Sequence, residues 1–260
     1  MSEPVLLGIP HDASSSFLRG SALAPSRIRK ALASPSSNLF SESLEDIGQL
    51  LDHGDLPLTN SAEDRAVIEA AIRERVVAGQ RPLCLGGDHS ITYPVLRGLA
   101  QAHPGLTLVD IDAHPDLYDE FQGDSFSHAC WLTRSLEAGL VERVVQVGIR
   151  GLTPDQRRNA TRFGVEMIDM RDWVAGKRPM ATGPTYLSID IDGIDPAFAP
   201  GVSHREPGGL TVREVLSIIQ SLGGEFRGAD IVEYNPEQDW QEVTARVAAK
   251  LVKEVASRMR

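Results

Sequence analysis

The sequence predicts an α/β fold, namely a three-layer α/β/α sandwich with a doubly wound, mainly parallel sheet. Two observations lead to this prediction: short apolar runs alternate with amphipathic helical patterns along the chain, and several of the runs are almost continuously apolar. Such runs are typical of strands that helices cover on both faces. Because no repeat, low-complexity tract or linker divides the 260 residues, we expect one domain over residues 1–260 with a sizeable core.

The expected elements follow from apolar runs and from residues that begin or end helices. The predicted strands are VLLGI (5–9), PLCLG (82–86), LTLVDI (106–111), RVVQVGI (143–149), GVEMIDM (164–170), TYLSIDI (185–191) and GADIVEY (228–234). The helix signals are Pro25 in a first turn, the capping-box pairs Ser61 with Asp64 and Thr211 with Glu214, the stop signals Gly79, Gly139 and Gly223, and a final amphipathic helix over residues 244–259.

The composition excludes several classes of partner. A formal net charge of −10 and the lack of a basic stripe argue against nucleic acid. The opening stretch MSEPVLLGIPHD has no basic segment before a long apolar one, and no apolar run approaches the ~18 residues of a membrane helix. The two cysteines, Cys84 and Cys130, are too few for a disulfide framework and are expected to be small core residues. We therefore expect a cytoplasmic protein that binds neither nucleic acid nor membrane.

Ionisable residues are concentrated in the stretch LTLVDIDAHPD, where Asp110, Asp112, His114 and Asp116 occupy every second position after an apolar run. Burying so many ionisable groups is costly unless a shared partner offsets the cost. Alternate residues of an extended segment point to the same side, so these side chains can face one cavity. The pattern indicates a divalent metal site.

Three further polar clusters directly follow or end predicted strands. They are GGDHS (86–90), DIDGIDP (190–196) and EYNPEQD (233–239). In open parallel sheets, ligands bind beyond the carboxyl ends of the strands, so all of these clusters should converge on one edge. Carboxylates mixed with imidazole favour Mn²⁺ among the first-row divalent ions, and the number of ligands suggests two ions about 3.5 to 4 Å apart.

Structural explanations exist for some of these motifs. In GGDHS, His89 could simply cap the following helix, and DIDGIDP could be a turn built from Asp, Gly and Pro, with Asp195 making the turn before Pro196. DAHPD is harder to explain in this way, because no common turn requires three ligand-type side chains in alternation. The joint occurrence of the motifs after strands favours the metal site.

The motifs GGDHS, DAHPD and SIDIDGIDPAFAPG resemble the signatures of the ureohydrolase (arginase and agmatinase) family in order and spacing. The resemblance covers nearly the whole chain and is greatest to plant-type arginases and their bacterial relatives. It implies an arginase-like fold and a Mn²⁺ pair bridged by hydroxide, the nucleophile. The metal ligands that it implies are His89, Asp112, His114, Asp116, Asp190 and Asp192.

The resemblance also implies catalytic roles for two residues outside the ligand set. Glu233 would pair with the substrate guanidinium, and His128 would be a proton shuttle for the leaving amine. Two further carboxylates, Asp88 and Asp110, either orient His89 or His114 or are ordinary polar groups at strand ends. The family usually assembles as trimers or hexamers, which implies a homo-oligomer.

The sequence leaves the substrate open between arginine and agmatine. The loop LYDEFQGDSFS (117–127) contains Asp119 and two further acids but no Lys or Arg, which favours an amine-ended substrate, although Ser127 or backbone N–H groups could bind a carboxylate. The plant-type resemblance favours arginine, and His204 could border the mouth of the site. Formimidoylglutamate or another guanidino compound, a deacetylase-type single-zinc site, a non-catalytic metal-binding role, and Ni²⁺ or Co²⁺ in place of Mn²⁺ remain alternatives.

Overall fold

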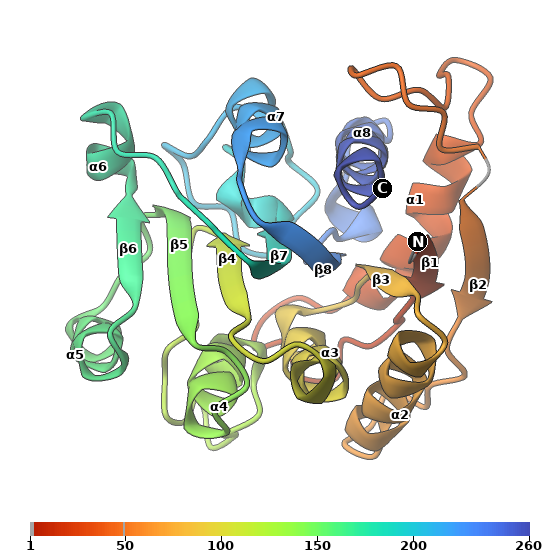
Figure 1. The fold of residues 1–260 in the computed structure, drawn as a ribbon. Helices are drawn as coiled ribbons and strands as arrows, with labels where there is room; N and C mark the ends of the chain where they lie inside the picture. Colours follow the sequence, from red (N-terminus) through yellow and green to blue (C-terminus); the bar gives the residue numbers. More distant parts are fainter. Residues whose placement is uncertain (1–2, 49) are drawn as a thin grey trace.

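The computed structural model describes residues 3–48 and 50–260, which form eight strands and eight α-helices (Figure 1). The strands are β1 (Pro4–Gly8), β2 (Leu51–Asp55), β3 (Arg81–Leu85), β4 (Thr107–Ile111), β5 (Arg143–Ile149), β6 (Glu166–Asp169), β7 (Pro184–Asp190) and β8 (Glu225–Val232). They make one sheet in the order β2-β1-β3-β8-β7-β4-β5-β6, and all neighbouring pairs are parallel. The predicted α/β class is confirmed.

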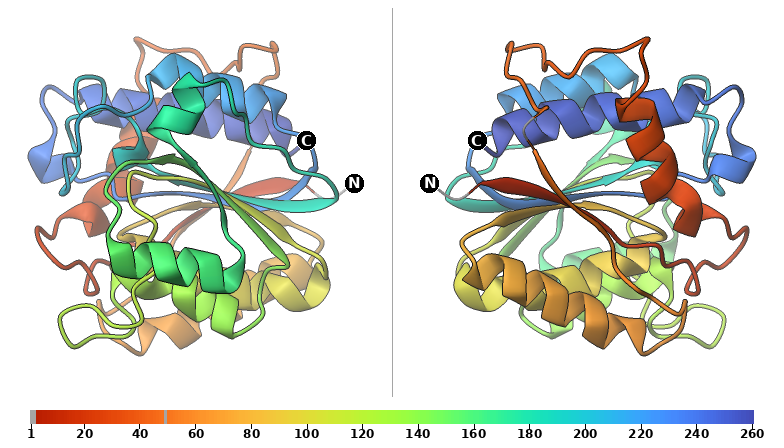
Figure 2. Two further views of the ribbon diagram at one scale, coloured as in Figure 1. Left: turned by 90° about the vertical axis from the view of Figure 1, so that its left-hand side faces the viewer. Right: turned by 90° about the vertical axis from the view of Figure 1, so that its right-hand side faces the viewer.

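The helices cover both faces of this sheet. They are α1 (Ala24–Leu32), α2 (Asp64–Val77), α3 (Thr92–Leu99), α4 (Trp131–Glu137), α5 (Pro154–Phe163), α6 (Met170–Val174), α7 (Val212–Ser221) and α8 (Val243–Arg258). Helices α2 to α5 lie on one face, and α1, α6, α7 and α8 lie on the other (Figures 1 and 2). The predicted three-layer α/β/α sandwich is therefore confirmed.

Each face of the sheet buries its own apolar cluster. Successive residues of a strand point to opposite faces, so Leu83 and Val109 join the cluster under α1, α7 and α8, whereas Cys84 and Leu108 join the cluster under α2 to α4. Cys84 and Cys130 are both buried and unpaired. The central strands are therefore covered on both sides, as their continuous apolar sequence predicts.

The structure corrects two predictions about local elements. Strand β2 was not expected, because its sequence LDHGD is polar and its residues are exposed or half-buried at the sheet edge. The capping box at Ser61 is wrong: the Asp64 carboxylate accepts a hydrogen bond from the Ser61 backbone N–H, and the Ser61 hydroxyl bonds Glu63 instead. The box at Thr211 and Glu214 is confirmed, and an unpredicted box joins Thr153 and Gln156.

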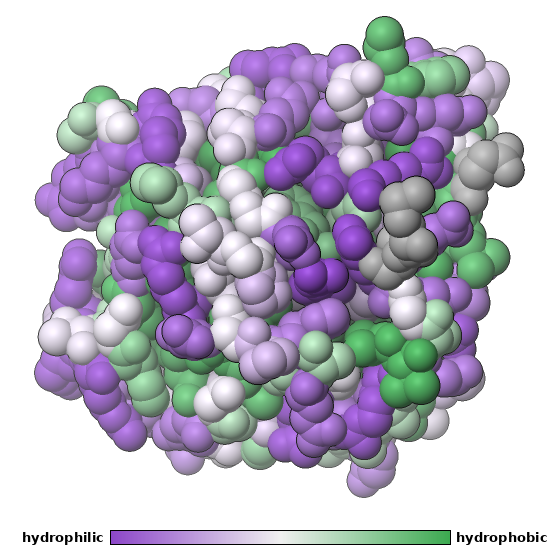
Figure 3. All heavy atoms as spheres, in the orientation of Figure 1, coloured by the Kyte–Doolittle hydropathy of each residue, from purple (hydrophilic) through white to green (hydrophobic). Residues whose placement is uncertain are grey.

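The surface is mainly hydrophilic on the side that Figure 3 shows, where hydrophobic residues emerge as separate patches. Within the described ranges, no helix has both the length and the apolar character needed to span a membrane.

Candidate metal centre

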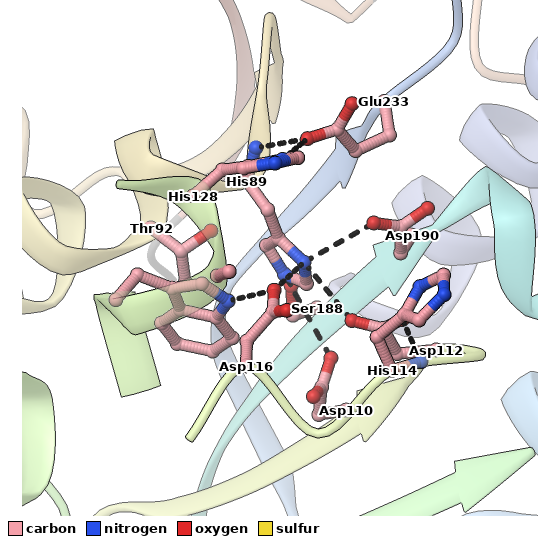
Figure 4. A network of polar contacts seen from close by, with 12 residues as sticks. His89, Thr92, Asp110, Asp112, His114, Asp116, His128, Ser188, Asp190 and Glu233 are labelled. Carbon is pink, nitrogen blue, oxygen red and sulfur yellow. Dashed lines mark hydrogen bonds and ion pairs between the residues drawn. The ribbon is translucent and has the colours of Figure 1, made fainter. Parts of the chain in front are cut away.

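The polar clusters converge as predicted at one edge of the sheet. Strands β3, β8, β7 and β4 are neighbours, and each is followed by one of the clusters. Because parallel strands end on the same side, the side chains meet in one buried group (Figure 4).

The deep half of this group is centred on His89, which is fully buried. Its Nδ1 atom lies 3.1 Å from Asp112 Oδ2, 3.3 Å from Asp116 Oδ2 and 3.2 Å from Asp190 Oδ2 (Figure 4). Among the described residues, neither His89 Nδ1 nor Asp112 Oδ2 has a hydrogen-bond partner. Buried polar atoms in proteins nearly always have a hydrogen-bond partner. A ring nitrogen and a carboxylate oxygen that lack one can instead coordinate a cation.

The outer half consists of Asp112, His114 and Asp192, whose ligand atoms all lie within 4.8 Å of one another. His114 Nδ1 is 3.1 Å from Asp192 Oδ2, and the His114 side chain keeps 27% of its exposure. Asp112 belongs to both halves, because it also groups with His89 and Asp116. A carboxylate shared in this way can bridge two cations.

The electrostatics of the group favour a bound cation. Burial raises the pKa of Asp112 and of Asp190 well above the usual carboxyl value, and neighbouring aspartates add to the effect. For His114, burial lowers the pKa, but Asp192 outweighs it and raises the pKa to about 10. In the protein alone the clustered carboxyl groups therefore resist ionising together, and a divalent cation would relieve the repulsion between their charged forms.

The local backbone is shaped around these ligands. Asp116 and Glu233 have positive φ angles of 52° and 62°, which are uncommon for residues other than glycine and are often found at functional sites. A Cβ atom on Gly151 would stand 2.5 Å from His114 Cδ2, so only glycine at this position leaves room for the His114 ring. The candidate ligands are therefore held by a backbone that is strained at Asp116 and Glu233 and that requires glycine at position 151.

A hydrogen-bond chain that the sequence did not reveal lies behind His89. His89 Nε2 is 2.9 Å from Ser188 Oγ, and Ser188 donates at 2.6 Å to Asp230. Asp230 is completely buried in β8 and also accepts from Thr92 and Tyr186. A lone aspartate in the apolar run GADIV was the available signal, because such a carboxylate needs partners.

The two carboxylates for which the sequence left open either an orienting role or an ordinary polar one, Asp110 and Asp88, differ in their contacts. Asp110 Oδ1 lies 3.8 Å from His89 Nε2, and its other oxygen accepts from Gln146; burial raises the pKa of Asp110 to about 7. Asp88 accepts hydrogen bonds from Ser90 and from the backbone N–H of Ser14. The Asp88 side chain thus fixes neighbouring loops, whereas the Asp110 side chain faces the ring of His89.

Arg150 ties the outer half to the neighbouring loops, which sequence reasoning also missed. Among the described residues, every hydrogen bond of its guanidinium ends on a backbone carbonyl. These carbonyls belong to Gly148, Asp192, Gly193 and Glu206. Asp195 makes the turn before Pro196, as predicted, by accepting from Ala197, Gly208 and Gly209.

His128 and Glu233 lie together beside the ligand group. His128 Nδ1 is 2.7 Å from Glu233 Oε1, and the same oxygen accepts from the His89 backbone N–H at 2.9 Å. Burial lowers the pKa of His128, but Glu233 outweighs it and raises the pKa to about 9. An imidazole and a carboxylate are thus aligned beside the candidate metal ligands.

A cavity of about 150 Å³ opens onto this assembly. Its lining combines ligand residues, His128 and Glu233 with a wall formed by Ser16, Tyr118, Phe121, Ala129, Gly151, Gln156 and His204. Of the three residues predicted to bind substrate, only His204 lines it. Asp119 is 62% exposed and faces Arg162 at 3.7 Å, whereas Ser127 is buried and caps the turn at Ala129.

The fold and the site together define a class: an α/β protein with one parallel sheet and a buried His/Asp group that is able to bind metal. The family model described as "Arginase family" matches residues 2–257, and the chain belongs to this family. It is 43% identical to a protein named Arginase 1, mitochondrial, of Arabidopsis thaliana, over 98% of this chain and 80% of that one. It is 32% identical to an agmatinase of Bacillus anthracis, over 98% and 91% of the two chains.

A solved structure agrees with these sequence comparisons. The arginase from Medicago truncatula superposes with a TM-score of 0.94 at 40% identity, covering 99% of this chain and 87% of that one. The predicted resemblance to the ureohydrolase family and to plant arginases is therefore confirmed, and the protein is a hydrolase of the arginase family.

Proposed function

We propose that this protein hydrolyses the guanidino group of arginine, releasing urea and ornithine, with two Mn²⁺ ions held by His89, Asp112, His114, Asp116, Asp190 and Asp192. The observation that carries the proposal is the shared position of Asp112 between two groups of ligand atoms, beside a cavity that also exposes His128 and Glu233. Such ions, when bound, would supply Lewis acidity and would lower the pKa of a bound water molecule toward neutrality.

The chain's own residues perform the remaining steps. Glu233, at the cavity wall, presents a carboxylate that pairs with the planar guanidinium of the substrate. Hydrolysis adds water to the guanidino carbon and breaks its bond to the side-chain nitrogen, and this leaving nitrogen must take up a proton. His128, held 2.7 Å from Glu233, is placed to deliver that proton.

Arginine is favoured over agmatine by two observations. The sequence argument for an amine-ended substrate depended on acids in the 117–127 loop, but Asp119, Glu120 and Asp124 are exposed and are not among the residues that line the cavity. The identity to plant arginases, at 43%, exceeds that to the agmatinase, at 32%. Agmatine remains the second candidate, since among the described residues no arginine or lysine side chain lines the cavity to bind an α-carboxylate.

Several broader properties belong to the same proposal. The family model covers residues 2–257, which supports a single ureohydrolase domain over the chain. We propose that this domain acts in the cytoplasm as a homo-oligomer, a trimer or a hexamer, on a small guanidino substrate. The relatives from plants are named mitochondrial, so the compartment is to be tested by cell fractionation and the oligomer by light scattering.

The function is tested by urea release from arginine and from agmatine, using Mn²⁺-loaded protein and a chelated control. We expect chelator-sensitive release that is faster with arginine. The Asp192→Asn variant should lose metal, measured by mass spectrometry, together with turnover. Asp155→Asn is the matched control, because Asp155 is an exposed carboxylate on α5 that pairs with Arg158. Faster release from agmatine would reverse the choice of substrate, and no urea from either compound would overturn the proposal.

A further inference from the structure

The loop that follows β1 crosses the carboxyl edge of the sheet and forms part of the cavity wall. It is anchored at Ser14, two residues before Ser16, by two hydrogen bonds. The Ser14 backbone N–H donates to Asp88 at 3.0 Å, and the Ser14 carbonyl accepts from the His128 backbone N–H at 3.1 Å. Ser16 is therefore held against the catalytic candidate His128, although 112 residues separate them in sequence.

Ser16 makes two contacts with one nitrogen of His128. Its backbone nitrogen lies 3.1 Å, and its hydroxyl oxygen 2.7 Å, from His128 Nε2. The other ring nitrogen, Nδ1, faces Glu233 at 2.7 Å. Ser16 also lines the cavity in which the substrate would bind.

These two contacts differ in what they permit. A backbone N–H only donates, so it is compatible with Nε2 only when that nitrogen carries no proton. A hydroxyl both donates and accepts, so the Ser16 side chain can donate to neutral Nε2 and accept from protonated Nε2. A histidine that gains and then gives up a proton needs a partner of this second kind in order to keep its position.

We propose that Ser16 is a positioning residue for His128, whose hydroxyl holds the imidazole in one place in both of its protonation states. The proposal rests on the hydrolytic function above, in which His128 delivers the proton to the leaving nitrogen. Its distinctive consequence is that the hydroxyl, rather than the serine backbone, stabilises the protonated ring.

Other charged groups also act on His128. Glu233 from the end of β8, Asp116 from the loop after β4 and Asp88 from the loop after β3 favour the protonated ring. His204, whose ring centroid is 5.4 Å away, opposes it when charged. None of these groups changes when the Ser16 hydroxyl is removed, so the effect of that hydroxyl can be isolated.

The test compares Ser16→Ala and Ser16→Thr with Ser15→Ala. The last is the matched control, because Ser15 is the neighbouring hydroxyl and bonds Asp88 rather than His128. Loss of the Ser16 hydroxyl should lower kcat for arginine about tenfold, with a smaller change in KM. It should also move the pH limb that reports His128 to lower pH, since a hydrogen-bond acceptor for the protonated ring is gone. Threonine should restore both values, and Ser15→Ala should match the wild type.

A second readout does not depend on turnover. The seven histidines can be followed by ring NMR in the metal-free protein, with His128→Asn assigning the His128 signal. We expect the pKa of His128 to fall in Ser16→Ala and to recover in Ser16→Thr. An unchanged pKa and an unchanged pH profile in a folded Ser16→Ala protein would overturn the proposal. If wild-type protein released no urea, the function would fail, while the NMR titration would still decide the role of Ser16.

Discussion

The two halves of the candidate metal centre are held in opposite ways. In the deep half, His89 is fully buried and its second nitrogen bonds Ser188, which bonds Asp230, so residues of the central strands fix it. In the outer half, His114 is 27% exposed, and Asp192 is held through its backbone carbonyl by Arg150. The deep half is thus held by residues of the sheet, whereas the outer half is held by contacts between loops.

Asp112 joins the two halves, so its loss should have the largest effect. In Asp112→Asn we expect both cations to be lost and turnover to fall roughly a thousandfold or more, because both ligand groups lose the shared carboxylate. Asp192→Asn should lose only the outer cation. Metal content by mass spectrometry, measured beside urea release, separates these outcomes. Equal metal loss in the two variants would contradict a division into halves.

Removal of the cations should destabilise the protein, and more so as pH rises. Burial raises the pKa of Asp112 and of Asp190, so the folded metal-free protein binds protons that the unfolded chain releases above about pH 4. Stability therefore falls as pH rises from that value. His114, with its pKa raised to about 10, acts in the same direction above about pH 6.5.

Thermal unfolding in chelator and in Mn²⁺ measures this effect. The difference in Tm between the two conditions should widen by about 5 °C between mildly acidic and mildly alkaline pH. A difference that stays constant or narrows would mean that the buried carboxylates are not the source of the metal-dependent stability.

The comparison also shows what sequence could and could not reveal. The clustering of the candidate ligands of both halves was predictable, because they follow apolar strands at alternate positions and strands of a parallel sheet end together. Strand β2 was not, since a polar edge strand has no apolar signal. Ser16 and Arg150 were missed because their partners lie far away in the chain. The Ser61 box failed because the Ser61 hydroxyl bonds Glu63 and does not cap the helix.

The deep half can be tested through Asp230, which touches no candidate ligand side chain except through Ser188. In Asp230→Asn we expect Mn²⁺ affinity at the deep position to fall about 10- to 100-fold, because the hydrogen-bond chain no longer fixes the tautomer and orientation of His89. Isothermal titration calorimetry with Mn²⁺ measures this change. Weakening of the outer position alone would contradict the assignment of Asp230 to the deep half.

The outer half is tested by Arg150→Lys, for which the smallest effect is expected. Lysine keeps the positive charge but replaces a planar fork of five donors with three donors on one atom, so it cannot reach the carbonyls of both Asp192 and Glu206. Affinity for the outer cation should fall about tenfold, with the deep cation unchanged.

The control for this variant is Arg158→Lys, an exposed arginine on α5 that pairs with Asp155. If the outer half depends on loop position, Arg150→Lys should also raise KM for arginine, because Glu206 and the neighbouring His204 belong to the loop that Arg150 holds. Weaker binding of the outer cation with an unchanged KM would limit the role of Arg150 to holding the metal ligands. Weaker binding of the deep cation alone would show that the two halves are not held separately.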